Sequence, residues 1–107
     1  MRLLLEDSEV NPFEATYNPG GFTPLHAAAQ FNATTALEAL LDDGRLPING
    51  LSDDGRTPLY FAANYGAHRA VEALLRSGAD ALILDKDGLT PADIASKNGH
   101  HEIVALI

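Results

Sequence analysis

Two adjacent histidines, His100 and His101, are the residues of this chain that first suggest a metal site. Adjacent residues on a helix point about 100° apart, so the two imidazoles do not reach one metal ion together. We therefore expect no metal site at this pair.

Carboxylates are the next candidates, because paired acidic side chains can perform acid–base catalysis. The sequence contains the pairs Asp42–Asp43 and Asp53–Asp54, with Asp85 and Asp87 further along. Catalytic carboxylates need a partly buried pocket that separates their pKa values. These residues fall at an expected helix end and on expected loop tips, where water solvates them. A solvated or partner-facing role is therefore favoured.

Motifs for phosphate binding and nucleophilic catalysis are missing from the sequence. The stretch NPGG is followed neither by Lys-Ser/Thr nor by the strand-then-helix context that a phosphate loop needs. The chain has no cysteine. No nucleophile-elbow context surrounds any of its serines, Ser8, Ser52, Ser77 and Ser96. We predict that the protein is not an enzyme, with no catalytic residue, no metal and no cofactor.

Composition narrows the classes of partner. The 107 residues are 46% hydrophobic, as in folded proteins, and 15 acidic residues against 7 basic ones give a net charge of −8. No segment is basic, so neither nucleic acid nor an anionic membrane surface is an expected partner. The apolar run Leu3–Leu5 is too short for a signal peptide or a membrane span. We expect a monomer inside the cell, cytoplasmic or nuclear.

A repeated motif indicates the elements that position these side chains. The stretch GFTPLHAAAQF, from Gly21, returns as GRTPLYFAANY from Gly55 and as GLTPADIASKN from Gly88. The threonines of the three copies, Thr23, Thr57 and Thr90, recur at nearly equal intervals along the chain. A nearly fixed period of this size is typical of one structural unit copied along the chain.

Each copy predicts two helices and a loop. Thr-Pro favours a helix start, because the threonine oxygen accepts a backbone N–H and proline suits the first helical position. An alanine-rich helix follows, and then Asn32, Gly66 or Gly99 provides a left-handed turn into a second helix with apolar residues at helical spacing. Glycines at Gly44 and Gly78 end the second helix, and a hairpin-like loop leads to the next copy. Stacking of the copies would bury the apolar helix faces.

The motifs resemble ankyrin repeats. DDGRTPLYFAANYGAHRAVEALLRSGAD (Asp53–Asp80) and DKDGLTPADIASKNGHHEIVALI (Asp85–Ile107) match the family pattern, and LLLEDSEVN resembles the tail of a preceding repeat. The resemblance implies an all-α ankyrin-repeat solenoid of stacked helix-turn-helix units with protruding β-hairpin-like loops. One domain, 1–107, would comprise a partial or capping repeat with a long loop (1–17), repeats 18–51 and 52–84, and a terminal repeat (85–107).

Departures from the family pattern are informative. Only His26 keeps the histidine of the TPLH motif, while Tyr60 and Asp93 replace it, so we expect the local network to differ in these copies. The sequence stops at Ile107, within the last helix, which favours a piece of a longer protein over a shortened helix. Asn32 in NAT matches a glycosylation acceptor and Asn11 a hydroxylated position of the family, and both modifications stay open.

The family binds partners through its concave face, formed by the hairpin tips and the outer surface of each first helix. Carried over by position, the expected partner-binding residues are Phe22, Gln30, Phe31, Asp53, Asp54, Arg56, Asn64, Tyr65, Lys86, Leu89, Lys97 and Asn98. Exposed apolar residues mark partner sites, and four members of this set are apolar: Phe22, Phe31, Tyr65 and Leu89. Alternatively, Phe31 and Tyr65 stack on each other, or the loop after Asn11 covers Phe22.

The predicted function is non-catalytic binding of another protein through the concave face and the hairpin tips. A second hypothesis is a regulatory or targeting segment of a larger multidomain enzyme or effector. A third is a structural spacer in a longer array. Fold alone does not choose among them, because function depends on sites placed on the fold.

Overall fold

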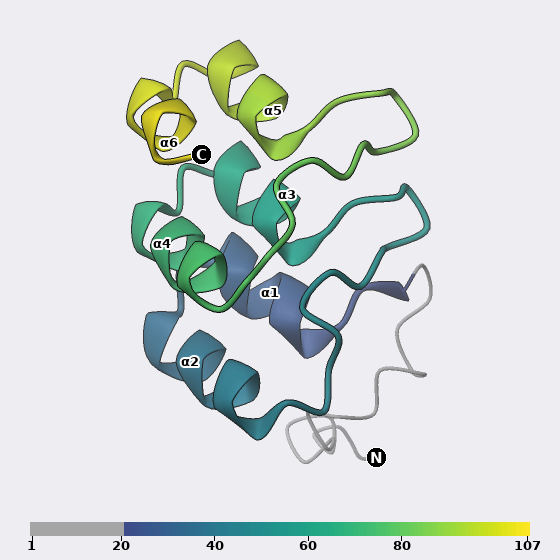
Figure 1. Ribbon diagram of the computed structural model, residues 1–107, viewed down its shortest axis with the longest axis vertical. Helices are drawn as coiled ribbons and strands as arrows, with labels where there is room; N and C mark the ends of the chain where they lie inside the picture. Colours follow the sequence, from purple (N-terminus) through teal and green to yellow (C-terminus); the bar gives the residue numbers. More distant parts are fainter. Residues whose placement is uncertain (1–20) are drawn as a thin grey trace, which may run out of the picture.

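Three helix pairs make up the part of the chain that the computed structural model describes, residues 21–107. The pairs are α1 (Pro24–Gln30) with α2 (Thr34–Asp43), α3 (Pro58–Asn64) with α4 (His68–Arg76), and α5 (Pro91–Lys97) with α6 (His101–Leu106). The first helices form one row, in which α3 packs between α1 and α5, and the second helices form a parallel row with α4 in the middle (Figure 1). Residues 21–107 contain no strand. The expected all-α stack of helix pairs is confirmed.

The start of each first helix is built as the Gly-x-Thr-Pro motif predicts. Thr23, Thr57 and Thr90 have extended backbones, and each hydroxyl oxygen accepts a hydrogen bond from the backbone N–H three residues later. A proline begins each of these helices. Three short helices are thereby begun at the same point of the repeat.

The turn inside each pair also follows the prediction. Asn32, Gly66 and Gly99 have positive φ angles of 55°, 70° and 80°. This left-handed conformation reverses the chain within a few residues. Asn32 adds a contact that glycine cannot make, because its Oδ1 accepts a hydrogen bond of 3.0 Å from the backbone N–H of Ala70 in α4.

The core runs along the stack instead of gathering at one centre. Its members come from all six helices, and they include Leu25 of α1, Leu59 of α3 and Ile94 of α5. Alanines Ala29, Ala63 and Ala95 are fully buried in the first helices, where their small side chains let neighbouring helices approach closely. The helix pairs therefore depend on one another for burial.

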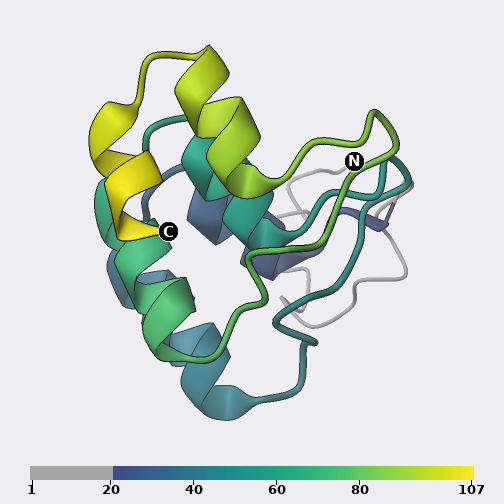
Figure 2. The ribbon, with the colours of Figure 1, turned by 45° about the horizontal axis from the view of Figure 1, so that its top comes forward.

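Two loops, residues 44–57 and 77–90, project together to one side of the helix rows, as Figure 2 also shows. Backbone hydrogen bonds close each tip: the N–H of Ser52 donates to the carbonyl of Arg56, and the N–H of Asp85 donates to that of Leu89. The N–H of Lys86 donates to the carbonyl of Asp54, which joins the two loops. They are hairpin-like without a strand ladder. The expected partial repeat at 1–17, with Asn11, lies outside the described residues.

Candidate partner-binding surface

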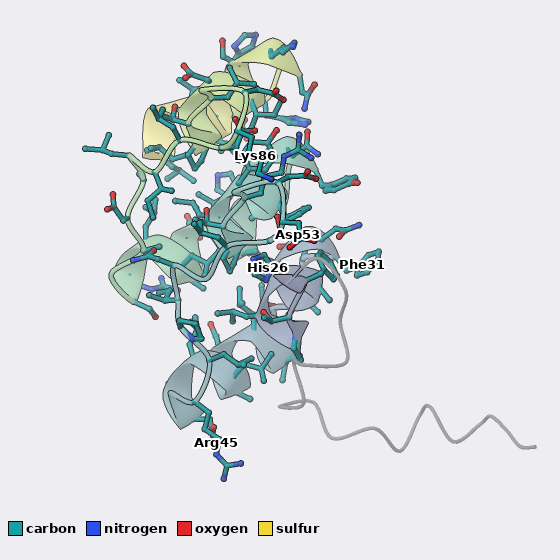
Figure 3. The ribbon with its side chains drawn as sticks, turned by 90° about the vertical axis from the view of Figure 1, so that its right-hand side faces the viewer. His26, Phe31, Arg45, Asp53 and Lys86 are labelled. Carbon is teal, nitrogen blue, oxygen red and sulfur yellow. The ribbon has the colours of Figure 1, made fainter. Side chains whose placement is uncertain are left out.

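Phe31 and Tyr65 occupy the same position in the first two copies, where they cap the C-termini of α1 and α3. Their side chains are 72% and 56% exposed. Figure 3 shows Phe31 at the edge of the molecule, projecting from the end of α1. Within residues 21–107, neither ring contacts another aromatic ring. The alternative that Phe31 and Tyr65 stack on each other is therefore wrong. Both residues are thus largely open to solvent at successive helix ends.

The third copy has Asn98 where the first two have aromatic rings. Its side-chain amide donates to the carbonyl oxygen and to the Oδ1 of Asn64, at 3.1 and 2.7 Å. Lys97 is exposed beside it, while Gln30 and Asn64 are half-buried. The predicted concave surface therefore changes from aromatic to polar along the stack.

The hairpin tips supply charge to the same candidate surface. Asp53, Asp54 and Lys86 are exposed, and Figure 3 shows Asp53 and Lys86 on neighbouring loops. The backbone bond between Lys86 and Asp54 keeps the two tips side by side. These tips can present both signs of charge to a partner.

Arg56 is held by acidic groups of its own chain. Its guanidinium lies 3.4 Å from Asp85, 3.7 Å from Asp54 and 3.8 Å from Asp87, and 4.9 Å from the centre of the Tyr60 ring. This half-buried side chain thus joins two loops, and less of its charge is available to a partner than the sequence predicts.

Asp85 anchors this cluster, and the expectation that water solvates its carboxylate on a loop tip is wrong, because the residue is buried. Its buried carboxylate accepts hydrogen bonds from the N–H groups of Asp87 and Leu89. Burial alone would raise the pKa of Asp85, but these amides, together with Arg56, outweigh it and hold that pKa below its ordinary value. The carboxylate is therefore a structural anion, ionised at neutral pH.

Phe22 and Leu89 are less available than their positions suggest. Phe22 is half-buried, and its ring packs edge-on against Phe61 of α3 at 5.3 Å between centroids. Leu89 is half-buried against the core. The residue that covers Phe22 is Phe61, from the next copy of the repeat, and the sequence analysis did not identify it. The expected cover by the loop after Asn11 lies outside the described residues.

His26 connects the first pair to the loops that follow. Its Nε2 lies 2.9 Å from the carbonyl oxygen of Gly50 and 3.1 Å from that of Arg56. Both are acceptors, so Nε2 carries a proton, and Nδ1 accepts a hydrogen bond from the N–H of Thr23 at 3.1 Å. Burial lowers the pKa of His26, although the two carbonyls partly oppose this effect. The neutral ring is thus a structural link.

Three exposed leucines on the loops were not singled out from the sequence. Leu82 is 79% exposed, and Leu51 and Leu84 are also exposed. Leu51 and Leu84 occupy equivalent positions, four residues before the glycine of their Gly-x-Thr-Pro motifs. This shared position in the repeat is the sequence feature that could have identified Leu51 and Leu84 as exposed loop residues.

The alternative chemistries can be placed on the same structure. The described part of the chain holds no cluster of three or more His, Cys, Asp or Glu side chains suited to a metal ion. His100 has its Nε2 3.2 Å from the carbonyl oxygen of Asn64, and His101 is exposed. The acidic pairs Asp42–Asp43 and Asp53–Asp54 are exposed. No helix within residues 21–107 has both the length and the apolar character needed to cross a membrane.

Comparison with known families agrees with this geometry. A model described as ankyrin repeats (3 copies) matches residues 45–107, and a model of the single ankyrin repeat matches residues 20–49. No curated protein matches the sequence. Ankyrin repeats are generally protein–protein interaction modules and typically non-catalytic. With its three capped helix pairs and paired loops, the chain belongs to the ankyrin repeat family.

Proposed function

We propose that the protein is a non-catalytic module that binds another protein along the first-helix row and the adjoining hairpin tips. The observation that carries the proposal is the exposure of Phe31 and Tyr65 on successive helix ends. Aromatic side chains are enriched among the residues that dominate binding energy at interfaces. We propose further that the module acts as a monomer in the cytoplasm or nucleus.

The physical basis is a surface that exists before the partner arrives. Caps, left-handed turns and loop-to-loop hydrogen bonds fix the two rings and the charged tips relative to one another. A preformed surface loses little conformational entropy on association, so a few anchors suffice. Exposed Asp53 and Asp54 would select a partner segment with complementary charge.

The test compares a Phe31→Ala/Tyr65→Ala double variant with a Leu82→Ala variant. Leu82 is a matched control, because it is a comparably exposed apolar residue on a loop and outside the proposed set. A partner captured by the wild-type chain is identified, purified and titrated against all three proteins. We expect the double variant to bind at least about tenfold more weakly, as loss of anchor residues predicts.

Thermal unfolding of the same variants separates binding from packing. Both anchor rings are exposed, so we expect the melting temperature of the double variant to stay within about 2 °C of wild type. A large drop in melting temperature would assign the rings to packing instead. Equal affinity of the double variant and the wild type would refute the proposed anchors.

A further inference from the structure

The dipeptide Asn-Gly occurs twice in the chain, at Asn49–Gly50 and at Asn98–Gly99. In this dipeptide the backbone nitrogen of glycine can attack the side-chain amide of asparagine, because glycine has no Cβ to hinder the approach. The second occurrence lies at the end of α5, where Asn98 is the C-cap and Gly99 follows with a φ of 80°. Both of these residues are exposed. The two dipeptides therefore offer the same chemistry in different surroundings.

Gly99 is less confined than Gly50. A Cβ built on Gly99 would meet no described atom within 4 Å, whereas at Gly50 it would lie 3.1 Å from the side chain of Pro47. Gly50 is also held at both ends, because its N–H donates to the carbonyl of Pro47 and its carbonyl accepts from the buried His26. The N–H of Gly99 donates to the carbonyl of Ser96, at the end of a helix of 7 residues. Helix ends open locally at low cost, so the dipeptide after α5 reaches the reactive geometry more often.

The side-chain amide of Asn98 links the third copy of the repeat to the second. Its nitrogen donates to the carbonyl oxygen of Asn64 at 3.1 Å and to the Oδ1 of the same residue at 2.7 Å. Asn49 uses the other end of its amide, because its Oδ1 accepts from the N–H of Asp80 at 2.9 Å. Loss of the amide nitrogen would therefore remove the donor at position 98, but would leave the acceptor in place at position 49.

We propose that Asn98 is a site of spontaneous deamidation that weakens the contact between the second and third copies. The backbone nitrogen of Gly99 gives up its proton to solvent and bonds to Cγ of Asn98, which closes a five-membered succinimide ring. The bond from Cγ to Nδ2 breaks, and the nitrogen takes up a proton and leaves as ammonia. Water then opens the ring at either carbonyl and leaves aspartate or isoaspartate, with no oxidation or reduction.

The product carries a carboxylate where the amide donated. A carboxylate has no proton to donate at neutral pH, so the two hydrogen bonds to the oxygens of Asn64 are lost. The new negative charge also lies at the C-terminus of α5, where the helix dipole disfavours an anion. Both effects act on the third helix pair. The inference does not depend on the proposed function, because it concerns the chain without a partner.

Peptide mapping by mass spectrometry measures the conversion at each site. The 107-residue chain is incubated in mildly alkaline buffer, folded or in concentrated urea, and the rates in urea give the reference for each dipeptide. We expect folding to slow the conversion of Asn98 at least about tenfold less than that of Asn49, because the end of α5 opens more readily. Asn98→Gln is the matched control, since it keeps an amide but would have to close a six-membered ring, and it should stay unconverted. Equal slowing at both sites, or stronger slowing at Asn98, would overturn the proposal.

Substitutions that imitate the product test its effect on the fold. Asn98→Asp and Asn49→Asp each add one negative charge, so the general charge repulsion of an acidic chain is matched between them. We expect Asn98→Asp to lower the melting temperature by at least about 3 °C and Asn49→Asp to lower it by less than about 1 °C. Equal melting temperatures of the two variants would refute the weakened contact.

Discussion

The starts of α1 and α5 share one backbone design but differ in what lies beyond them. In both, a threonine hydroxyl accepts a hydrogen bond from the third helical residue, and the side chain of that residue accepts one from the threonine N–H. His26 of α1 is buried and reaches two further carbonyls, at Gly50 and Arg56. Asp93 of α5 is exposed and completes only the cap.

The faces around these helix starts show the same contrast. Leu25 and Ala29 are fully buried under the second pair, whereas their equivalents in the third copy are Ala92, half-buried, and Ser96, exposed. Positions covered by a following copy hold apolar or fully bonded residues. Their equivalents in the third copy, Ala92, Asp93 and Ser96, which no described copy covers, are small or polar. The role of a repeat position thus depends on whether another copy covers it.

The largest expected loss of stability comes from substituting His26, the residue that most distinguishes the start of α1 from that of α5. His26→Ala removes the packing against Phe22 and Phe61 and the Nε2 donor shared by two carbonyls, of which that of Arg56 keeps its bond from the N–H of Ser52. We expect the free energy of unfolding in urea to fall by about 2–4 kcal/mol. Asp93→Ala loses only an exposed cap partner and should cost about 1 kcal/mol or less. Equal losses would show that burial does not distinguish the two starts.

A smaller effect compares the turns at Gly66 and Gly99. Both have positive φ, so alanine strains the backbone by about 1–2 kcal/mol at either position. At Gly66 a Cβ would also lie 2.9 Å from the His100 ring, whereas at Gly99 no described atom lies within 4 Å. We expect Gly66→Ala to cost about 1 kcal/mol more, because the displaced His100 loses its contact with Asn64. Chemical denaturation of both variants measures the difference, and identical costs would contradict it.

The smallest effect is a pH dependence confined to the first copy. Burial lowers the pKa of His26 below 6.5, so the unfolded chain binds its proton more readily than the folded one. Stability from the neutral ring is complete above about pH 6.5 and is lost as pH falls from there toward the folded pKa, by at most about 1.4 kcal/mol per pH unit. Unfolding curves of wild type and His26→Gln at several pH values test this. The variant should have a flatter profile in this range.

Acid below this range should reveal a second group. The pKa of Asp85 is held below 3.8, so its contribution is present above that value and is lost as pH falls through the folded pKa. As pH falls, the loss from His26 therefore begins near 6.5 and the loss from Asp85 begins near 3.8. We expect the stability of His26→Gln still to fall as pH drops below about 3.8, because this variant retains Asp85.

Several features of the fold could be predicted from the sequence because they depend on near neighbours in the chain. Thr23, Thr57 and Thr90 cap helices through amides three residues away, and Asn32 and the glycines turn the chain locally. The replacement of His26 by Tyr60 and Asp93 predicted different local networks, and this is confirmed.

Which candidate side chains are free to contact a partner could not be predicted from near neighbours in the chain. Phe22 is covered by Phe61, and Arg56 is held by Asp85, each from another copy. Such contacts have no local sequence signal, because the partner lies in the next copy of the repeat, far along the chain. Exposed Phe31 and Tyr65 agree with their predicted exposure, but their role in binding stays a prediction.

The amino-acid sequence by itself determined the repeat, the capped helices, the turns and the family, because these rest on residue types within a few positions of one another. Only the tertiary structure decided which equivalent residues are covered. Ala36 and Ala70 are the same amino acid at the same repeat position, yet one is exposed and the other is fully buried. The physical reason is that burial depends on what packs above a side chain, and stacking places distant segments there.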